Sequence, residues 1–593
     1  MGGVSASCMS KDDLKEQVPH VHIEAVRKLK AQSVHVGEAR PNEGRPRRAT
    51  ESASVPTKEV YGQFASQPSL PEVLASHAKN FPDRIALSYR LMTTIEGGGD
   101  VSPSKRMDIT YGQLNELVSN VAQNLRRSGV APGTCVILWE ETRFELLVAC
   151  LAAWRAGCYV RCVQLPGGPS TVGYILWELD EACKAGVLIC NAKQLPALKD
   201  DMFANNDFKN PIKIFLIDVA ANDIPAESDE KYTQHSFAKL LEAPEDAVEL
   251  SGCKPDDIAV VMTIQRPRGP DGIILTHSNV LAAIAGLKDH LKPVLDELAG
   301  EKSTHAGAQQ EESREPLGYS QQEAKPNDAV VPVYVAFAPF THIAEFIGEL
   351  LMLSIGGTIG YGTVKTLFTP SESNSQQGDL AEYQPHILMT VPRMLEKITN
   401  KYKSLPVTKS ATFKRAYDDR LQALKKGKET PFWNTKAFSE TRGFLGGRCK
   451  VMLCYGDGTV TPKEMREYLT VTTGVAICDI YGQEETCGVG LIRRYFDLQT
   501  GGGVIGCPTS VTEVKLVEPN ERPDPDGKPL PFTHGEICIR GPHVTVVGYT
   551  SRKRDDEVTL EKLDADGWYH TGLIGEWQDD GAMKFIRQRR GHP

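Results

Sequence analysis

A ten-residue segment, TIQRPRGPDG at residues 263–272, carries side chains that could bind phosphate. It lies between the apolar run IAVVM and the segment GIILTHSNVLAAIAGL, a position where many α/β enzymes hold phosphate. Arg266 and Arg268 offer positive charge. Gly269 and Gly272 allow a ligand to approach the backbone closely. This combination indicates a turn for the phosphates of a nucleotide.

Two residues of the same segment oppose phosphate binding. Pro267 has no backbone N–H to donate, and Asp271 brings a negative charge next to the expected phosphates. Two interpretations therefore stay open from the residues alone. The segment is either a nucleotide loop of unusual composition or one that has been dismantled.

The elements around this segment predict an α/β fold. Strands such as VILW, AGVLIC and PIKIFLID alternate with amphipathic helices, which is typical of a parallel sheet covered by helices. One helix is expected to begin at a capping box of Thr110 and Gln113, and another at a box of Thr142 and Glu145. After about residue 505 the apolar residues alternate, which predicts a small β-rich unit.

The ends and one internal segment have a different composition. Residues 1–55 are polar and unpatterned, so we expect a disordered tail, and residues 298–328 are expected to form a disordered surface insertion. Gly2 and Cys8 are compatible with myristoylation and palmitoylation, although Ala6 stands where Ser or Thr is usual. A tail that merely begins with glycine is the alternative.

Composition excludes some functions. The net charge of −9 disfavours a general nucleic-acid surface. The 14 cysteines form no CxxC pair and many lie in apolar runs, so we expect buried free thiols in a reducing compartment. No segment reaches the roughly 18 apolar residues of a membrane span, and we see no signal peptide. The expected location is the cytoplasmic side, with peripheral contact to the endoplasmic reticulum or another membrane left open.

A second segment, YGQEETCG at residues 481–488, resembles the YGxTE motif of adenylate-forming enzymes. The segments YVAFAPFTHIAEFIGELLMLSIGGTIGYG, LGGRCKVMLCYG and GWYHTGLIGEWQDDG resemble eukaryotic long-chain acyl-CoA synthetases, and the resemblance runs from about Val60 to the end. It implies the large N-terminal domain of that superfamily, with two doubly wound parallel-sheet subdomains and a small β-barrel-like subdomain.

The resemblance also implies an activity and a site. Such enzymes use ATP and Mg²⁺ to convert a long-chain fatty acid into an acyl-adenylate, and then transfer the acyl group to coenzyme A. Glu485 would act in catalysis and bind the metal, and His342 would lie beside the reacting carboxylate. The residues expected to bind the nucleotide are Arg266, Arg268, Gly269, Gly272, Gly456, Asp457, Tyr481, Gly482, Thr486 and Thr571.

The sequence departs from the family pattern in several nucleotide motifs. Asp271 stands where the loop lysine is expected, and Leu573 stands at the carboxylate that would hold the ribose. Tyr455 and Asp457 replace small residues near the adenine, and Glu484 replaces a threonine. The chain ends at IRQRRGHP, so the small C-terminal domain with the catalytic lysine is expected to be absent.

These departures lead to three open interpretations of function. Millimolar ATP binding is worth only about 4 kcal/mol, and each lost charged hydrogen bond costs about 1.5–3 kcal/mol. We therefore expect a member of the ligase family whose adenylation is weak or lost. The alternatives are a non-catalytic binding or scaffold protein for a long-chain fatty acid or acyl-CoA, with an intact paralogue as a candidate partner, and an incomplete gene model of an active ligase.

Overall fold

The computed structural model describes most of the chain. The described residues are 31–38, 40, 43–64, 69–94, 101–165, 168–181, 186–199, 211–223, 231–266, 269–300, 330–368, 377–456, 460–498, 501–517, 534–550 and 562–588. Within them the strands form two hydrogen-bonded sheets, one of eight strands and one of fifteen. The expected insertion at 298–328 lies almost wholly outside the described residues, as do Gly2 and Cys8.

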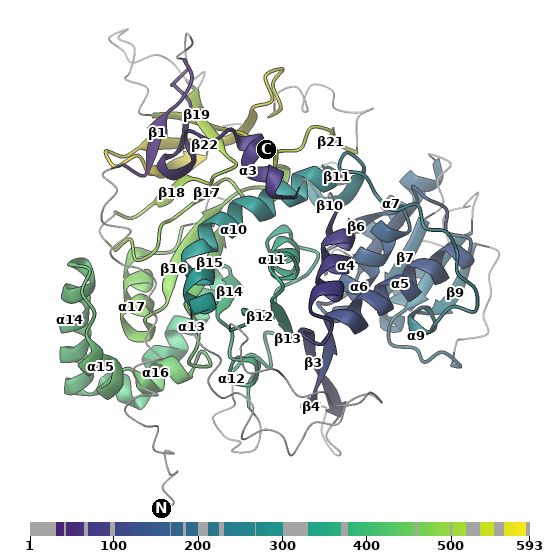
Figure 1. Ribbon diagram of the computed structural model, residues 1–593, viewed down its shortest axis with the longest axis horizontal. Helices are drawn as coiled ribbons and strands as arrows, with labels where there is room; N and C mark the ends of the chain where they lie inside the picture. The colour runs from purple at the N-terminus through teal and green to yellow at the C-terminus, as the bar shows by residue number, and fades with distance from the viewer. Residues whose placement is uncertain are drawn as a thin grey trace, which may run out of the picture.

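The eight-stranded sheet is mostly parallel (Figure 1). Its order is β21-β11-β10-β6-β5-β7-β8-β9, and the strands from β10 to β9 are parallel. The bounds are β5 Cys135–Trp139, β6 Tyr159–Cys162, β7 Gly186–Cys190, β8 Ile212–Leu216, β9 Tyr232–Ser236, β10 Ile258–Arg266, β11 Gly269–Thr276 and β21 Gly548–Tyr549.

Helices cover both faces of this sheet. Val136 and Leu138 of β5 belong to the large core cluster that includes α5 and α6, whereas Ile137 packs with α7 on the other face. This alternation is the pattern of a doubly wound sheet. The helices are α4 Leu70–Asn80, α5 Tyr111–Arg127, α6 Phe144–Arg155, α7 Gly168–Glu181, α8 Leu195–Leu198 and α9 Phe237–Leu241.

The second parallel unit forms the middle of the fifteen-stranded sheet. Strands β3, β13, β12, β14, β15 and β16 run parallel, and Tyr334 and Val335 of β12 face opposite core clusters. The strand bounds are β3 Ile85–Thr94, β4 Val101–Thr110, β12 Val333–Ala336, β13 Thr358–Tyr361, β14 Ile387–Thr390, β15 Val451–Gly456, β16 Ala476–Tyr481 and β17 Leu491–Ile492. The predicted pair of doubly wound units is confirmed.

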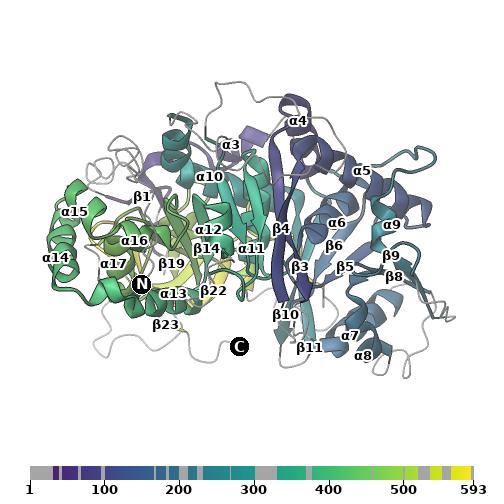
Figure 2. The same cartoon turned by 90° about the horizontal axis from the view of Figure 1, so that it is seen from below.

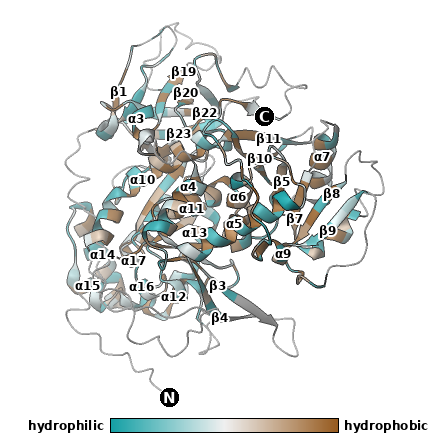
Figure 3. Ribbon diagram, turned by 45° about the vertical axis from the view of Figure 1, so that its right-hand side comes forward, coloured by the Kyte–Doolittle hydropathy of each residue, from teal (hydrophilic) through white to brown (hydrophobic). Residues whose placement is uncertain are grey.

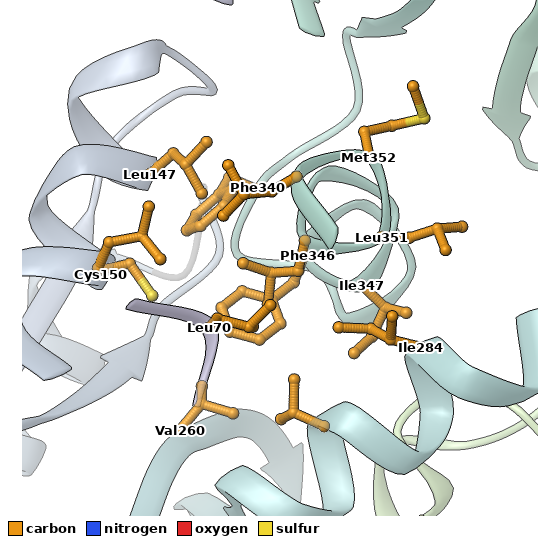
Figure 4. Packing of buried hydrophobic residues seen from close by; sticks show 14 of the residues in the cluster. Leu70, Leu147, Cys150, Val260, Ile284, Phe340, Phe346, Ile347, Leu351 and Met352 are labelled. Carbon is orange, nitrogen blue, oxygen red and sulfur yellow. The ribbon is translucent and has the colours of Figure 1, made fainter. Parts of the chain in front are cut away.

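Two long helices pack together against this second unit. Helix α10, His277–Gly300, lies beside α11, Ile343–Ser354, and all residues of α11 are buried. Phe340, Phe346, Leu351 and Met352 fill the space around α11 (Figure 4). The other helices are α12 Asp379–Tyr383, α13 Pro392–Ser404, α14 Ala411–Lys425, α15 Pro431–Lys436, α16 Ser439–Gly443 and α17 Lys463–Thr473. Figure 3 shows that the central strands are largely hydrophobic.

The antiparallel unit at the upper left of Figure 1 brings together early and late segments of the described chain. Its strands are β18 Val504–Pro508, β19 Glu513–Val517, β20 His534–Arg540, β22 Tyr569–Trp577 and β23 Met583–Gln588, with β1 Ser33–His35 and β2 Arg47–Ala49 at the edge. Helix α3, Thr57–Tyr61, follows. The expected tail through residue 55 is thus wrong for the described residues 31–55, because β2 pairs with β19 through Arg47 and Val514.

Two local expectations had different outcomes. The capping box of Thr110 and Gln113 is confirmed at the start of α5. The box of Thr142 and Glu145 is wrong, since α6 is capped at Arg143 without a side-chain bond. The Thr142 hydroxyl instead donates to the carbonyl of Ala338. The Thr142 hydroxyl, which local spacing assigned to the helix cap, is therefore bonded to a loop far away in the sequence.

Candidate nucleotide-binding site

The segment expected to be a ten-residue phosphate loop is a β-hairpin. Strands β10 and β11 pair from their far ends up to Arg266 opposite Gly269, so only residues 267 and 268 lie between them. Thr263 lies opposite Gly272 in this register. The expected ten-residue turn is therefore wrong.

The described backbone of the hairpin is paired as a sheet. Anion-binding loops direct successive N–H groups at one point, whereas paired antiparallel strands direct theirs sideways within the sheet. The N–H of Gly272 lies 3.1 Å from the Thr550 hydroxyl and 2.8 Å from Asp271 Oδ1. Thr550 N–H in turn donates to the Gly272 carbonyl at 2.8 Å. A donor expected to bind phosphate is thus bonded within the protein.

The side chains of the hairpin contact each other and β21. Arg266 Nε lies 3.2 Å from Asp271 Oδ2, and its guanidinium carbon lies 4.5 Å from the centre of the Tyr549 ring. Asp271 is only 3% exposed, and the Thr550 hydroxyl donates to its Oδ1 at 3.1 Å. Arg266 is therefore partly neutralised by Asp271. Arg268 lies outside the described residues.

Glu485, the expected metal ligand, lies in a 3₁₀ turn, Glu484–Thr486, after β16. Its side chain is buried, and its Oε1 accepts a hydrogen bond from the Tyr549 hydroxyl at 2.7 Å. Lys562 Nζ lies 4.0 Å from the same oxygen. Burial, and then Glu485, raise the pKa of Tyr549, so its hydroxyl stays protonated and donates. The carboxylate is thus held by two groups of the protein.

The same hydrogen bonds link the hairpin to the turn that carries Glu485. Tyr549 contacts Arg266 on one side and Glu485 on the other. Thr545 strengthens the link, because its N–H donates to the Glu485 carbonyl and its hydroxyl to the carbonyl of Ile274 in β11. Two segments that should enclose a nucleotide are therefore joined directly.

A second group of expected site residues lies at the other side of this turn. Gly482 allows close packing, because a Cβ there would lie 2.2 Å from the Gly488 carbonyl carbon. The Tyr455 hydroxyl donates to the Gly482 carbonyl at 2.7 Å, and the His342 ring lies edge-on to Tyr455 at 5.2 Å. His342 also caps α11, since its Nδ1 accepts from the Ala344 N–H at 3.2 Å. Tyr455 thus stands between His342 and the turn.

The remaining expected residues have structural contacts. Tyr481 is buried at the end of β16 opposite Gly456, the last residue of β15. The Thr486 hydroxyl donates to the Gln483 carbonyl at 3.0 Å, and the Thr571 hydroxyl donates to the Ile537 carbonyl at 2.8 Å. Asp457 lies outside the described residues.

Leu573, at the expected ribose position, is a core residue. It is 6% exposed and belongs to the cluster that contains Tyr481, Tyr569 and Trp577. Leucine itself has no polar side-chain atom that could accept hydrogen bonds from a ribose diol.

The structure brings together residues that the sequence did not single out. Tyr549, Thr550 and Lys562 contact the expected site, but they lie far along the chain from the hairpin. No local spacing pattern could have indicated these contacts. Among the described residues, no group of three or more His, Cys, Asp or Glu side chains could hold a metal ion.

Other features lie away from this site. A cavity of about 370 Å³ is lined by residues that include Ser69, Asn115, Arg155 and Cys253, and by none of the expected site residues. The Arg155 guanidinium there is already bonded to Asn115 and Ser119.

All twelve cysteines in the described part of the chain are free, and eleven are buried, as expected. No helix in the described part is long and apolar enough to cross a membrane.

Comparison with known proteins assigns the fold. Residues 74–549 match the family model described as AMP-binding enzyme. The chain belongs to the AMP-binding enzyme family. Curated proteins similar to this chain include long chain acyl-CoA synthetase 8 of Arabidopsis thaliana, which is 27% identical over 499 residues, and the peroxisomal synthetase 7 of the same plant, which is 28% identical over 542 residues. The resemblance to long-chain acyl-CoA synthetases is confirmed.

These matches cover a larger share of this chain than of its relatives. The synthetase 8 match covers 81% of this chain and 63% of the relative, and the synthetase 7 match covers 88% and 68%. The chain thus spans about two thirds of the length of these relatives.

Solved structures confirm the fold class. A long-chain-fatty-acid-CoA ligase of Archaeoglobus fulgidus matches with a TM-score of 0.58 and 18% identity, covering 88% of this chain and 84% of that one. The N-terminal domain of FACL13 from Mycobacterium tuberculosis matches with a TM-score of 0.57 and 17% identity, covering 87% and 99%.

Proposed function

We propose that this AMP-binding family member is a long-chain acyl-CoA synthetase relative in which adenylation is weak or lost. The observation that carries the proposal is the closed β10–β11 hairpin, whose Arg266 and Asp271 pair with each other. The contacts of Glu485 with Tyr549 and Lys562 and the burial of Leu573 support it.

ATP and Mg²⁺ do not fit the described residues as they stand. Phosphates at the hairpin would meet Asp271 and a backbone without converging N–H groups, and a metal at Glu485 would displace Tyr549 or Lys562. Leaving a buried polar group without a partner costs about 1–3 kcal/mol. Two or three such losses cancel the roughly 4 kcal/mol that millimolar affinity provides. Coenzyme A stays an expectation from the family.

Binding of Mg-ATP tests this proposal directly. At millimolar Mg-ATP we expect the melting temperature to rise by less than about 1 °C, because a ligand stabilises only in proportion to its occupancy. A rise of several degrees that Arg266→Ala abolishes would mean that Arg266 binds phosphate, contrary to the proposal. Arg127→Ala, on α5, is the matched control.

A second function, binding of a long acyl chain without activation, is favoured by the packing around α11. Gly348 of α11 faces Met389, and a Cβ there would lie 2.5 Å from the Met389 Sδ. Gly357 similarly faces Met352, with 2.4 Å to its Cε. Methionine side chains are flexible and adapt readily to new shapes. An acyl chain could therefore enter by displacing two methionines rather than branched side chains.

Displacement of a fluorescent fatty-acid probe measures this binding. We expect a long-chain fatty acid or acyl-CoA to displace the probe saturably with a dissociation constant of about 1 μM, about −8 kcal/mol. Gly348→Ala narrows the space beside Met389 and should weaken binding several-fold. Gly443→Ala is the control, since a Cβ there meets no atom within 4 Å. Unsaturable displacement, or equal effects of both variants, would contradict acyl binding at α11.

A further inference from the structure

A helical lobe next to the second parallel unit carries an unusual charge. Its 50 residues, 401–450, contain thirteen Lys and Arg and four Asp and Glu side chains, a formal charge of +9. The whole chain carries −9, so the remaining residues together carry −18. The lobe is therefore a positive region on an otherwise acidic protein.

The lobe has a small core of its own. Phe413, Leu424 and Phe438 pack together with Val471 of α17. The Thr441 hydroxyl donates to the Thr472 carbonyl at 2.6 Å, which fastens α16 to α17. Helices α14 and α15 lie at the left-hand edge of the molecule in Figures 1 and 2. The part of the lobe formed by α14 and α15 thus lies at the periphery of the molecule.

The junction of α14 and α15, residues 425–436, has a composition that we call the lysine–phenylalanine tip. Lys426, Lys428 and Lys436 are exposed, and Lys425 is half-buried. Phe432 lies between them in sequence and is 62% exposed, one of the largest exposures of an apolar side chain in the described residues. The tip therefore presents four positive charges around an exposed aromatic ring.

These lysines have little compensation from carboxylates. Among the described residues no ion pair involves Lys426, Lys428 or Lys436, and Lys425 lies 3.8 Å from Glu467. Glu429, the one acidic residue of the tip, accepts a hydrogen bond from Asn434 at 3.1 Å. Lys436 instead lies 5.2 Å from the centre of the Phe432 ring. The positive charges of Lys426, Lys428 and Lys436 are thus available to a partner.

We propose that the lysine–phenylalanine tip docks the protein on an anionic lipid surface. Basic residues near such a surface are attracted by its negative potential, and apolar side chains such as phenylalanine beside them bury at the boundary between headgroups and acyl chains. Lysine stems lie along apolar surface while their ammonium groups reach phosphates, which suits lysines around a phenylalanine. This docking depends on the tip alone and is independent of whether the protein adenylates.

The composition of the tip favours lipid over nucleic acid. All four of its cations are lysines, whereas bidentate and stacked recognition of nucleic acid favours arginine. An extended polyanion would also meet the charge of −18 outside the lobe. A membrane contacts only the protruding tip, so this repulsion is smaller and falls off within the Debye length.

Co-sedimentation of the full chain with vesicles tests the proposal. One set of vesicles is phosphatidylcholine alone, and the other contains 30 mol% phosphatidylserine, a fraction of roughly one lipid in three chosen to give a strong surface potential. The first variant replaces Lys425, Lys426, Lys428 and Lys436 with Gln, and the second is Phe432→Ser.

The matched controls make the same kinds of substitution at exposed positions outside the tip. One replaces four exposed lysines, Lys79, Lys193, Lys239 and Lys254, with Gln. The other is Val546→Ser, which removes an apolar side chain that is 80% exposed. Because all substitutions are at exposed or half-buried positions, melting temperatures should stay near that of the unaltered protein, and this is checked first.

We expect binding to the phosphatidylserine vesicles only, lost at high salt. One lysine near an anionic surface is worth about fivefold in partitioning, so the four-lysine tip variant should bind at least about tenfold more weakly. Phe432→Ser should weaken binding several-fold, and both controls should bind normally. Equal losses in tip and control variants, or no vesicle binding, would overturn the proposal. Binding of single-stranded RNA in place of vesicles, lost in the tip variant, would also overturn it.

Discussion

The buried glutamate Glu349 of α11 should make the stability of this protein depend on pH. Glu345 and Glu349 are one helical turn apart and at most 1% exposed. The Tyr334 hydroxyl donates to Glu345 at 2.8 Å, and the Tyr361 hydroxyl donates to Glu349 at 2.6 Å. Burial raises the pKa of Glu349 to about 8, and burial together with Glu349 raises that of Glu345.

The sign of the effect follows from the raised pKa. The unfolded chain ionises Glu349 near pH 4.5, whereas the folded protein keeps it protonated up to about pH 8. The contribution of Glu349 to the free energy of unfolding is therefore fully present below pH 4.5 and is lost as the pH rises through 8. A pKa difference of this size lowers the free energy of unfolding by about 5 kcal/mol. Glu349→Gln keeps an acceptor for Tyr361 but cannot ionise, so it escapes this loss.

Thermal unfolding at pH 5 and pH 8 measures the effect. We expect Glu349→Gln to melt close to the unaltered protein at pH 5 and several degrees higher at pH 8. Glu116→Gln, at an exposed position of α5, should change neither value. An equal difference between Glu349→Gln and the unaltered protein at both pH values would refute the reasoning, because Glu349 would then ionise at the same pH in the folded and the unfolded protein.

Three further substitutions test the packing around the site by melting temperature. Asp271→Asn removes the charge that pairs with Arg266, and should destabilise the protein by about 1–3 kcal/mol; an unchanged melting temperature would mean that the pair does not hold the hairpin. Leu573→Asp places a carboxylate in an apolar cluster, and should destabilise by at least about 3 kcal/mol without creating ATP binding; a stable variant that binds ATP would contradict this. Phe346→Ala should cost about 3–5 kcal/mol, since the side chain is fully buried against Phe340 and Trp154.

Local patterns predicted the elements whose partners are near in sequence. The helix that begins at Thr110 has its apolar stripe and its capping partner Gln113 within one segment, and it forms as expected. The apolar strands of both parallel units were likewise evident, because their residues are buried on both faces.

Long-range contacts decided the features that local patterns could not predict. Gly, Pro and Asp in the segment 263–272 favoured a loop, yet Thr550, 278 residues beyond Gly272, bonds to it and holds it as a hairpin. Residues 33–35 and 47–49 looked like tail because they are short and polar, but they pair with each other and then with β19. Thr142 failed as a helix cap because Ala338 takes its hydroxyl hydrogen bond.

Fatty-acid-dependent release of pyrophosphate from ATP tests the central claim most directly. The purified 593-residue protein is assayed with Mg²⁺ and a long-chain fatty acid, beside a long-chain acyl-CoA synthetase relative as the positive control and Glu485→Ala as the control for a contaminating ligase. We predict release at background for the unaltered protein, and also for Asp271→Lys combined with Leu573→Asp, because groups that act together on one transition state are strongly non-additive. Release clearly above background that Glu485→Ala abolishes would contradict the account.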